Sequence, residues 1–415
     1  MKILLISHIF PPAIDGGSKV IYKLGQYFES QNHQTLYLSS NCSSTDDFIK
    51  KSPALSREGF RKGFIKLPTY HHLRRPLKFL NLFLKQDLLK VFQKGPIFKI
   101  FPFLKATYQI LKFKPDLIIA GPLPTTIILY AVFFKKITNS KLLINASFHP
   151  TDQDFQQKPL INTLKKADFL WTLTQSETDY FTKNFNIDPK KIILAGNGVD
   201  YNFLKKSKIP RLVSAKSRSA SGGKGGLGSF NILFIGSLAA HKRVDILIKS
   251  FSDILASRPV KGGIEGGFKL TIAGQKTLFY SQIEKLINSL DPKLKSKINF
   301  IFNFNQKDLA KIIDNCSVLV LPSVQESFGL VIVEAWARQK PVICADIPAL
   351  KELVQNSNGG LLFKTNDQSD LTKKIQEIID NPKKSEQMGK NGYNYVKNNY
   401  TWNNVGNKIC QKILC

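Results

Sequence analysis

Two glutamates stand eight residues apart in the segment PSVQESFGLVIVEAWARQKPV (residues 322–342), in a chain with 30 acidic residues against 60 basic ones. Glu326 precedes a Phe-Gly pair, and Glu334 follows it. The apolar run before the pair predicts a buried strand, and the run after it predicts a helix. Glu326 would then lie in the loop at the carboxyl end of the strand, and Glu334 within the helix. Carboxylates at these two places can accept hydrogen bonds from sugar hydroxyls.

The predicted helix begins at Phe328, Gly329 and Leu330. Up to four backbone N–H groups lack partners at a helix start, and the helix dipole is positive there. Because Gly329 has no side chain to block a close approach, this start is suited to phosphate. A diphosphate between two hydroxyl-binding carboxylates describes a nucleotide-sugar, with Glu334 on the ribose and Glu326 on the transferred hexose. The alternative is a dipole-favoured acid at Glu326 and an exposed helical residue at Glu334.

A second strand, glycine turn and helix is predicted in LFIGSLAAHKRVDILIKSF (residues 233–251). It carries Lys242 and Arg243 where the helix begins. A lysine at this place supplies a point charge for a diphosphate. The alternative is a solvated basic residue, but a cation at a helix start opposes the dipole preference.

These segments belong to two series of alternating strands and helices, which predict two doubly wound parallel sheets. Strands in such sheets are buried on both faces, and ligands bind beyond their carboxyl ends. The fold class is therefore α/β, with two Rossmann-like domains and a cleft between them. We expect an N-terminal domain at residues 1–204, a flexible glycine- and serine-rich linker at 205–229 and a C-terminal domain at 230–395. A terminal helix at 396–415 is expected to pack back on the first domain. A second glycine-rich insertion at 257–268 reads as a surface loop.

Composition restricts the class of protein. At 415 residues and 43% apolar residues, the chain can form two cores and is not generally disordered. Its five cysteines form no CxxC pair, which favours reduced thiols in a cytoplasm over disulfides or a zinc site. We see no signal-peptide pattern at the start of the sequence. The apolar stretch 117–134 contains Gly and Pro, and it predicts a buried strand, a turn and a buried helix rather than a membrane span.

The net charge of +30 is unevenly distributed. Residues 51–150 contain 18 Lys or Arg and three acidic residues, which gives this region a net charge of +15. Such a region favours an anionic partner, and the alternative is a lysine-rich solvated surface. Residues 76–94 can form a helix with aromatic residues interleaved among lysines, as in interfacial helices on anionic lipid, or a core helix with a polar face.

Several motifs together resemble the retaining GT-B glycosyltransferases of family four. They are GSLAAHKRVDILI, IAG, PSVQESFGLVIVEAWA and KPVICAD in the second domain. In the first domain, PPAIDGGSKVIYKLGQYFESQNHQTLYLSS is similar to the family's amino-terminal glycine loop, and NASFHP and GNGVD follow in the expected order. The resemblance covers nearly the whole chain and implies the GT-B fold.

In the second domain, the resemblance assigns Glu326 to the donor sugar and Glu334 to the ribose. It places the diphosphate on the backbone of Phe328–Leu330 and makes Lys242 the lysine that neutralises it. The second domain contains no D-x-D metal motif, so we expect a nucleotide-sugar donor, UDP- or GDP-linked, with no cofactor and no required metal.

In the first domain, Gly16 and Gly17 match the loop beneath donor and acceptor. His149 matches the family's active-site histidine, which faces the anomeric carbon. By itself, a single histidine before a proline is more often structural.

The sequence departs from the family pattern at three positions. Ser237 stands where the family often has an arginine that contacts the diphosphate, and Arg243 is the candidate substitute. Gln339 replaces a glycine before KPV, and Gly196 replaces a proline before NGVD.

The resemblance implies a retaining glycosyltransferase that moves a hexose-type sugar from the donor to a hydroxyl acceptor. We expect a glycan or lipid-linked acceptor in cell-envelope synthesis, at a cytoplasmic and peripheral membrane location, with an anionic membrane as partner of residues 51–150 and no nucleic acid. The rival functions are a non-catalytic basic lipid- or nucleic-acid-binding protein on the same fold, and a nucleotide-sugar epimerase.

Overall fold

The computed structural model describes two compact units of the chain. The first unit comprises Met1–Gly198 and Trp402–Cys415, and the second comprises Val199–Thr401. The units therefore change at residues 198 and 401, whereas the sequence analysis placed the boundaries at 204 and 395. The described residues are 1–10, 16–40, 63–67, 99–150, 152–204, 230–257, 267–304 and 306–414. The expected linker 205–229, most of the insertion 257–268 and the expected helix 76–94 lie outside them.

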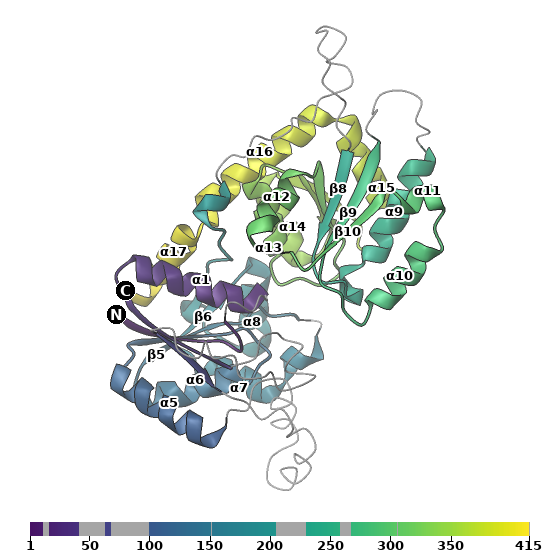
Figure 1. Cartoon of the computed structure of the whole chain (residues 1–415). Coiled ribbons are helices and arrows are strands. Elements are labelled where there is room, and N and C mark those ends of the chain that lie inside the picture. Colours follow the sequence, from purple (N-terminus) through teal and green to yellow (C-terminus); the bar gives the residue numbers. More distant parts are fainter. Residues whose placement is uncertain are drawn as a thin grey trace. The chain divides into compact units, whose positions relative to one another are not determined.

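The first unit contains a seven-stranded parallel sheet with the order β3-β2-β1-β4-β5-β6-β7. Its strands are short apolar runs, as expected for strands buried on both faces. Helices α5, α6 and α7 lie along one face of the sheet, and α1 and α17 lie along the other (Figure 1). The strands are β1 Lys2–Ile6, β2 Gln34–Ser40, β3 Phe64–Leu67, β4 Leu117–Ala120, β5 Lys141–Asn145, β6 Phe169–Thr172 and β7 Ile192–Leu194. The helices are α1 Gly16–Ser30, α5 Ile100–Phe113, α6 Ile127–Thr138, α7 Lys158–Lys165, α8 Gln175–Phe185 and α17 Trp402–Leu414.

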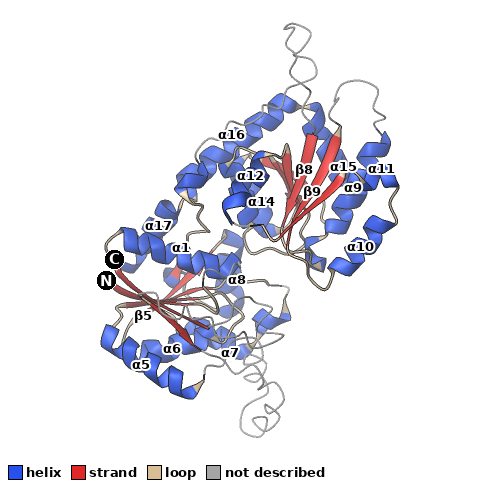
Figure 2. Cartoon of the chain, in the orientation of Figure 1, coloured by secondary structure: helices blue, strands red, loops and turns tan. Residues whose placement is uncertain are grey.

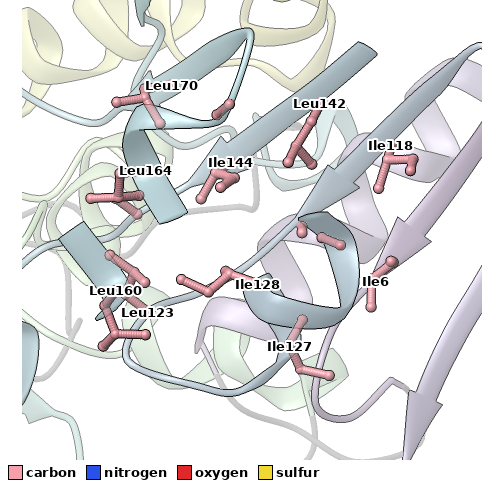
Figure 3. Packing of buried hydrophobic residues seen from close by; sticks show 14 of the residues in the cluster. Ile6, Ile118, Leu123, Ile127, Ile128, Leu142, Ile144, Leu160, Leu164 and Leu170 are labelled. Carbon is pink, nitrogen blue, oxygen red and sulfur yellow. The ribbon is translucent and has the colours of Figure 1, made fainter. Parts of the chain in front are cut away.

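The core under α6 and α7 is built from branched aliphatic side chains. Ile118 and Ile144 of the sheet lie in one cluster with Ile128 of α6 and Leu164 of α7 (Figure 3). All four are at most 1% exposed. Burying one such side chain stabilises the fold by about 1.5–3 kcal/mol. The stretch 117–134 thus forms buried strand β4, a turn and the start of α6, as the sequence predicts.

The last helix, α17, belongs to the first unit and packs against α1. Tyr27 of α1 donates a hydrogen bond from its hydroxyl to Asn407 Oδ1 at 2.6 Å. Lys141 Nζ donates to the carbonyl of Ile413 at 3.0 Å. A Cβ at Gly406 would lie 2.4 Å from the Tyr27 ring, so the contact requires glycine there. The chain thus returns to its first unit after residue 401.

The second unit contains a six-stranded parallel sheet with the order β10-β9-β8-β11-β12-β13. Helices flank this sheet as well (Figure 2). Both sheets confirm the predicted pair of doubly wound Rossmann-like domains. The strands are β8 Phe230–Ile235, β9 Phe268–Gly274, β10 Ile298–Phe302, β11 Val318–Leu321, β12 Val342–Ala345 and β13 Gly360–Phe363. The helices are α9 Val244–Ser257, α10 Tyr280–Asn288, α11 Pro292–Lys295, α12 Gln306–Asp314, α13 Leu330–Ala337, α14 Pro348–Ser357, α15 Gln368–Asp380 and α16 Pro382–Asn399.

Three cysteines fall within the described part of the chain. Cys316 and Cys344 are buried free thiols, and Cys410 is a half-buried free thiol. Among the described helices, none combines the length and apolar character that a membrane crossing needs.

Candidate functional site

The two loops that carry the predicted donor residues lie side by side in the second unit. Strands β8 and β11 are neighbours at the point where the strand order reverses, which is where ligands bind in such sheets. The backbone N–H of Val324, after β11, donates to the carbonyl of His241, after β8, at 2.9 Å. Lys242 Nζ and Glu326 Oε1 form an ion pair at 2.5 Å. Their side chains are 17% and 13% exposed, so solvent screens this pair less than a surface pair.

The loop of Ser237 is held from the neighbouring strand. Leu238 N donates to the carbonyl of Gln275, which follows β9, at 2.9 Å. The hydroxyl of Thr277 donates to the carbonyl of Leu238. Three adjacent strands therefore fix the backbone around Ser237, Lys242 and Glu326 at one edge of the sheet.

The start of α13 adopts a conformation that requires glycine. Gly329 precedes Leu330, the first residue of the helix, and has a φ of +86°, which L side chains rarely adopt. A Cβ at this position would also lie 2.7 Å from Leu350 Cδ2. Phe328 is 1% exposed and packs edge-on against Tyr400 at 5.2 Å between ring centroids. The helix start is thus anchored by a buried ring and depends on a glycine, because a side chain at residue 329 would be strained and would collide with Leu350.

Glu334 lies just over one turn into α13 and is only 7% exposed. The alternative interpretation, an exposed helical residue, is therefore wrong. A carboxylate is rarely buried to this degree without hydrogen bonds or charge partners, so the Glu334 side chain must lie among polar groups.

Arg243 already has partners in the second unit. It has a φ of +48° and forms a two-point contact with Asp245, Nε to Oδ1 at 3.1 Å and Nη2 to Oδ2 at 3.2 Å. Its Nη1 also contacts Asn366 Oδ1. To replace the arginine that the family often has at Ser237, Arg243 would have to leave these contacts.

The other two departures from the family pattern have local structural settings. Gln339 has a φ of +55°, the left-handed region in which glycine is favoured. This explains why the family usually has glycine there. Gly196 follows β7, and its carbonyl accepts a hydrogen bond from Trp171 Nε1 at 2.9 Å.

Gly16, Gly17 and His149 lie in the first unit, beyond the carboxyl ends of strands β1 and β5. Gly16 and Gly17 are the first residues of α1, and a Cβ at Gly17 would lie 2.4 Å from Pro122 Cγ. A Cβ at Gly16 would have no other atom within 4 Å. His149 is half-buried, and its ring packs edge-on against Phe155 at 5.1 Å.

A buried glutamate that the sequence analysis missed holds the backbone beside His149. Glu177 of α8 is 4% exposed. Its Oε1 accepts from Phe148 N at 2.8 Å, and its Oε2 accepts from Leu173 N at 2.6 Å. One carboxylate therefore joins the loops after β5 and β6. The signal in the sequence is an acid three residues after Thr174, whose side chain caps α8.

The sequence analysis also missed Lys276, a cation at the carboxyl end of β9. Lys276 Nζ lies 4.3 Å from the ring centroid of Tyr280 and 4.7 Å from that of Phe302. Leu238, beside Ser237, pairs with Lys276 as a parallel bridge. Two aromatic rings therefore hold a positive charge next to the Ser237 loop. A lysine directly after the motif IAGQ was the available signal.

The described side chains include no group of three or more His, Cys, Asp or Glu residues placed to hold a metal ion.

Residues 226–395 match the family model described as glycosyl transferases group 1. This segment, nearly all of it in the second unit, is therefore a domain of that family, and the resemblance seen in the sequence is confirmed. The narrower assignment to family four stays a prediction.

Three relatives of known name match part of the chain. An uncharacterized glycosyltransferase of Methanocaldococcus jannaschii is 30% identical over 252 residues, 59% of this chain and 65% of that protein. A D-inositol 3-phosphate glycosyltransferase of Streptomyces coelicolor is 28% identical over 238 residues, 54% of this chain and 50% of that protein. The O-antigen chain mannosyltransferase RfbU of Salmonella typhimurium is 24% identical over 216 residues, 52% of each chain. The chain thus spans between about half and two thirds of the length of these relatives.

Two solved structures share the fold over the whole chain. HepE of Anabaena, solved with UDP and glucose, has a TM-score of 0.72 at 17% identity and covers 100% of this chain and 99% of its own. Sucrose-phosphate synthase of Thermosynechococcus elongatus has a TM-score of 0.71 at 18% identity, with 100% and 98% covered. The fold is therefore the GT-B fold, as the resemblance implied.

Proposed function

We propose that the chain is a retaining glycosyltransferase that moves a hexose-type sugar from a nucleotide-diphosphate donor to a hydroxyl acceptor. The observation that carries this proposal is the ion pair between Lys242 and Glu326, which are 84 residues apart in the sequence. The pair lies beside the start of α13, which Gly329 precedes. A cation, a carboxylate and free helix N–H groups at one sheet edge are the groups that a sugar joined to a diphosphate needs. The family match over residues 226–395 supports the same function.

The donor is proposed to be a UDP- or GDP-linked sugar. Two charged phosphates would face Lys242 and the N–H groups that begin α13, and Glu334 would bind the ribose hydroxyls. HepE of Anabaena has been solved in complex with UDP, with UDP and glucose, and with UDP-glucose, which supports a uridine nucleotide. Lys276 is a further candidate contact, since its ammonium group is next to the Ser237 loop.

The proposed chemistry depends on charge more than on proton transfer. When the bond from the anomeric carbon to the diphosphate breaks, the electron pair leaves with the diphosphate and the sugar gains oxocarbenium character. Lys242 and the start of α13 stabilise the leaving group, as fixed charges do best in a preorganised site. The acceptor hydroxyl then attacks from the face that the diphosphate leaves, its proton passes to an oxygen of the departing diphosphate, and the configuration is retained. Glu326 and His149 are the proposed catalytic residues, with Glu326 at the donor sugar and His149 facing the anomeric carbon.

The acceptor is proposed to be a glycan or a lipid-linked glycan of the cell envelope, reached from the cytoplasmic side. The likeness to an O-antigen mannosyltransferase supports this class of acceptor. We further propose that no metal is required. Transfer that persists in excess EDTA would support this, and transfer restored only by Mg²⁺ or Mn²⁺ would refute it.

The test is direct titration of the full chain with UDP, GDP and their glucose, mannose, galactose and N-acetylglucosamine conjugates. One nucleotide series should bind, and Lys242→Met and Glu334→Gln should each weaken it tenfold or more. The control is Lys384→Met, because Lys384 also forms an ion pair in the second unit, with Glu377 at 2.7 Å, but on helix α16. Failure of every nucleotide-sugar to bind, or equal losses in the control, would refute the proposed site.

A further inference from the structure

Helix α5 in the first unit has two apolar faces, and only one of them packs against the described part of the chain. The packed face contains Ala106 and Ile110, which are at most 1% exposed. Phe103 on this side contacts three rings of α6, among them Phe134 at 5.7 Å between centroids. The opposite face carries large apolar side chains in solvent: Ile100, Phe101, Leu104, Tyr108 and Leu111, exposed by 63, 85, 58, 68 and 41%.

These exposed side chains form one continuous stripe. At 3.6 residues per turn they fall within a sector of about 100° on the helix. Phe133 and Ile137 of α6 are also exposed, by 42% and 37%, and the ring contact between Phe103 and Phe133 at 5.9 Å joins the two helices. Single exposed apolar residues are common, but seven on two adjoining helices mark an interaction surface. We call these seven residues the α5–α6 surface.

The charged side chains on the two helices themselves have one sign, and the acids that adjoin them include Asp116, after α5, and Asp168, which pairs with Lys135 of α6 at 2.7 Å. Neither α5 nor α6 contains an acidic residue. Five exposed lysines stand on or next to the two helices: Lys99, Lys105, Lys112, Lys114 and Lys136. On the α5 helical wheel, Lys105 and Lys112 lie just beside the apolar stripe, about 40° and 20° beyond Phe101.

We propose that the α5–α6 surface docks on an anionic lipid bilayer. The apolar side chains would enter the boundary between headgroups and acyl chains, with α5 lying in the membrane plane, and the lysines would contact lipid phosphates. A protein partner would need acidic residues placed to match the lysines beside the stripe, whereas an anionic bilayer supplies negative charge around the whole stripe. The inference goes beyond the proposed function, because this binding does not depend on sugar transfer. It places the surface at residues 99–137, within the basic region 51–150 for which the sequence predicts an anionic partner; the expected helix 76–94 lies outside the described residues.

The test is sedimentation of the full chain with vesicles of phosphatidylcholine alone or with 30% phosphatidylglycerol. The unchanged protein should bind the anionic vesicles, and binding should weaken as salt rises. The double variant Phe101→Ser/Leu104→Ser should lose binding tenfold or more. Lys105→Gln/Lys112→Gln should lose about 30-fold, since each of the two lysines near such a surface contributes about 1 kcal/mol.

The matched control for the apolar change is Leu278→Ser, because Leu278 is 91% exposed but lies in the second unit. All variants should keep their melting temperature and nucleotide-sugar affinity, so that a failure of docking is distinguished from a failure of the proposed donor site. Absence of binding to anionic vesicles would overturn the proposal. So would a concentration-dependent dimer that the Phe101→Ser/Leu104→Ser change dissociates, because the surface would then join two copies of this chain.

Discussion

The Glu177 carboxylate offers a sharp test of how the first unit holds its loops. Replacing it by alanine removes the acceptor of two backbone N–H groups, those of Phe148 and Leu173. Both acceptor bonds are buried, and a buried donor left without a partner costs about 1–3 kcal/mol. Glu177→Ala should therefore weaken the local structure by about 2–6 kcal/mol.

Glu177→Gln should have an intermediate effect on local stability. Its carbonyl oxygen can still accept one of the two bonds, but its amide nitrogen would face the other donor. We expect roughly half the loss, about 1–3 kcal/mol. Asp179→Ala is the control, since Asp179 is an exposed acid on the same helix and should change stability by about 0.5 kcal/mol or less.

Hydrogen exchange read by mass spectrometry is the suitable assay, because it reports the two loops separately from the second unit. A local loss of 2–6 kcal/mol speeds exchange of the Phe148 and Leu173 amides by at least about 30-fold. In a transfer assay, Glu177→Gln should lower kcat more than it raises KM for the donor, because it displaces the loop of His149. Unchanged exchange in Glu177→Ala would show that the carboxylate does not hold these loops.

Three further changes test other features of the second unit. Gly329→Ala should destabilise by about 2–4 kcal/mol, from the positive φ and the contact with Leu350, and a urea midpoint that does not fall would contradict this. Gln339→Gly should keep or raise stability, by up to about 1 kcal/mol, because it relieves a left-handed residue; a lower unfolding midpoint would count against that account. Burial raises the pKa of the Cys316 thiol to about 12 and raises that of Cys344 as well. Both thiols should therefore resist iodoacetamide at pH 8 in the folded chain and react in urea, as peptide mass spectrometry would show.

The sheets were predictable because each parallel strand is a short apolar run with a turn at its end. KILLIS, PDLIIA and SVLVLPS all became buried strands. The candidate donor residues were predicted from motifs on single loops. Their mutual contacts did not, since Lys242 meets Glu326 only because β8 and β11 are neighbours in the sheet.

Residues that act across the fold left weaker signals. Glu177 joins the loops after β5 and β6, and the local capping pattern of Thr174 and Glu177 gives no sign that the carboxylate also accepts from Phe148 N. The exposed stripe of α5 was hidden for a related reason. A helix that is apolar nearly all round reads as buried, and only packing decides which face is left in solvent.

The pairing of Lys242 with Glu326 also bears on how the proposed diphosphate site is stabilised. A lysine that is only 17% exposed would incur a desolvation penalty if it stood without a counter-ion. The Glu326 carboxylate supplies the opposite charge at 2.5 Å. In the proposed complex, the diphosphate would bring negative charge to the same lysine, and Glu326 would become available to the hydroxyls of the donor sugar. Under this proposal, the carboxylate that binds the sugar is also the group that positions the lysine for the leaving group.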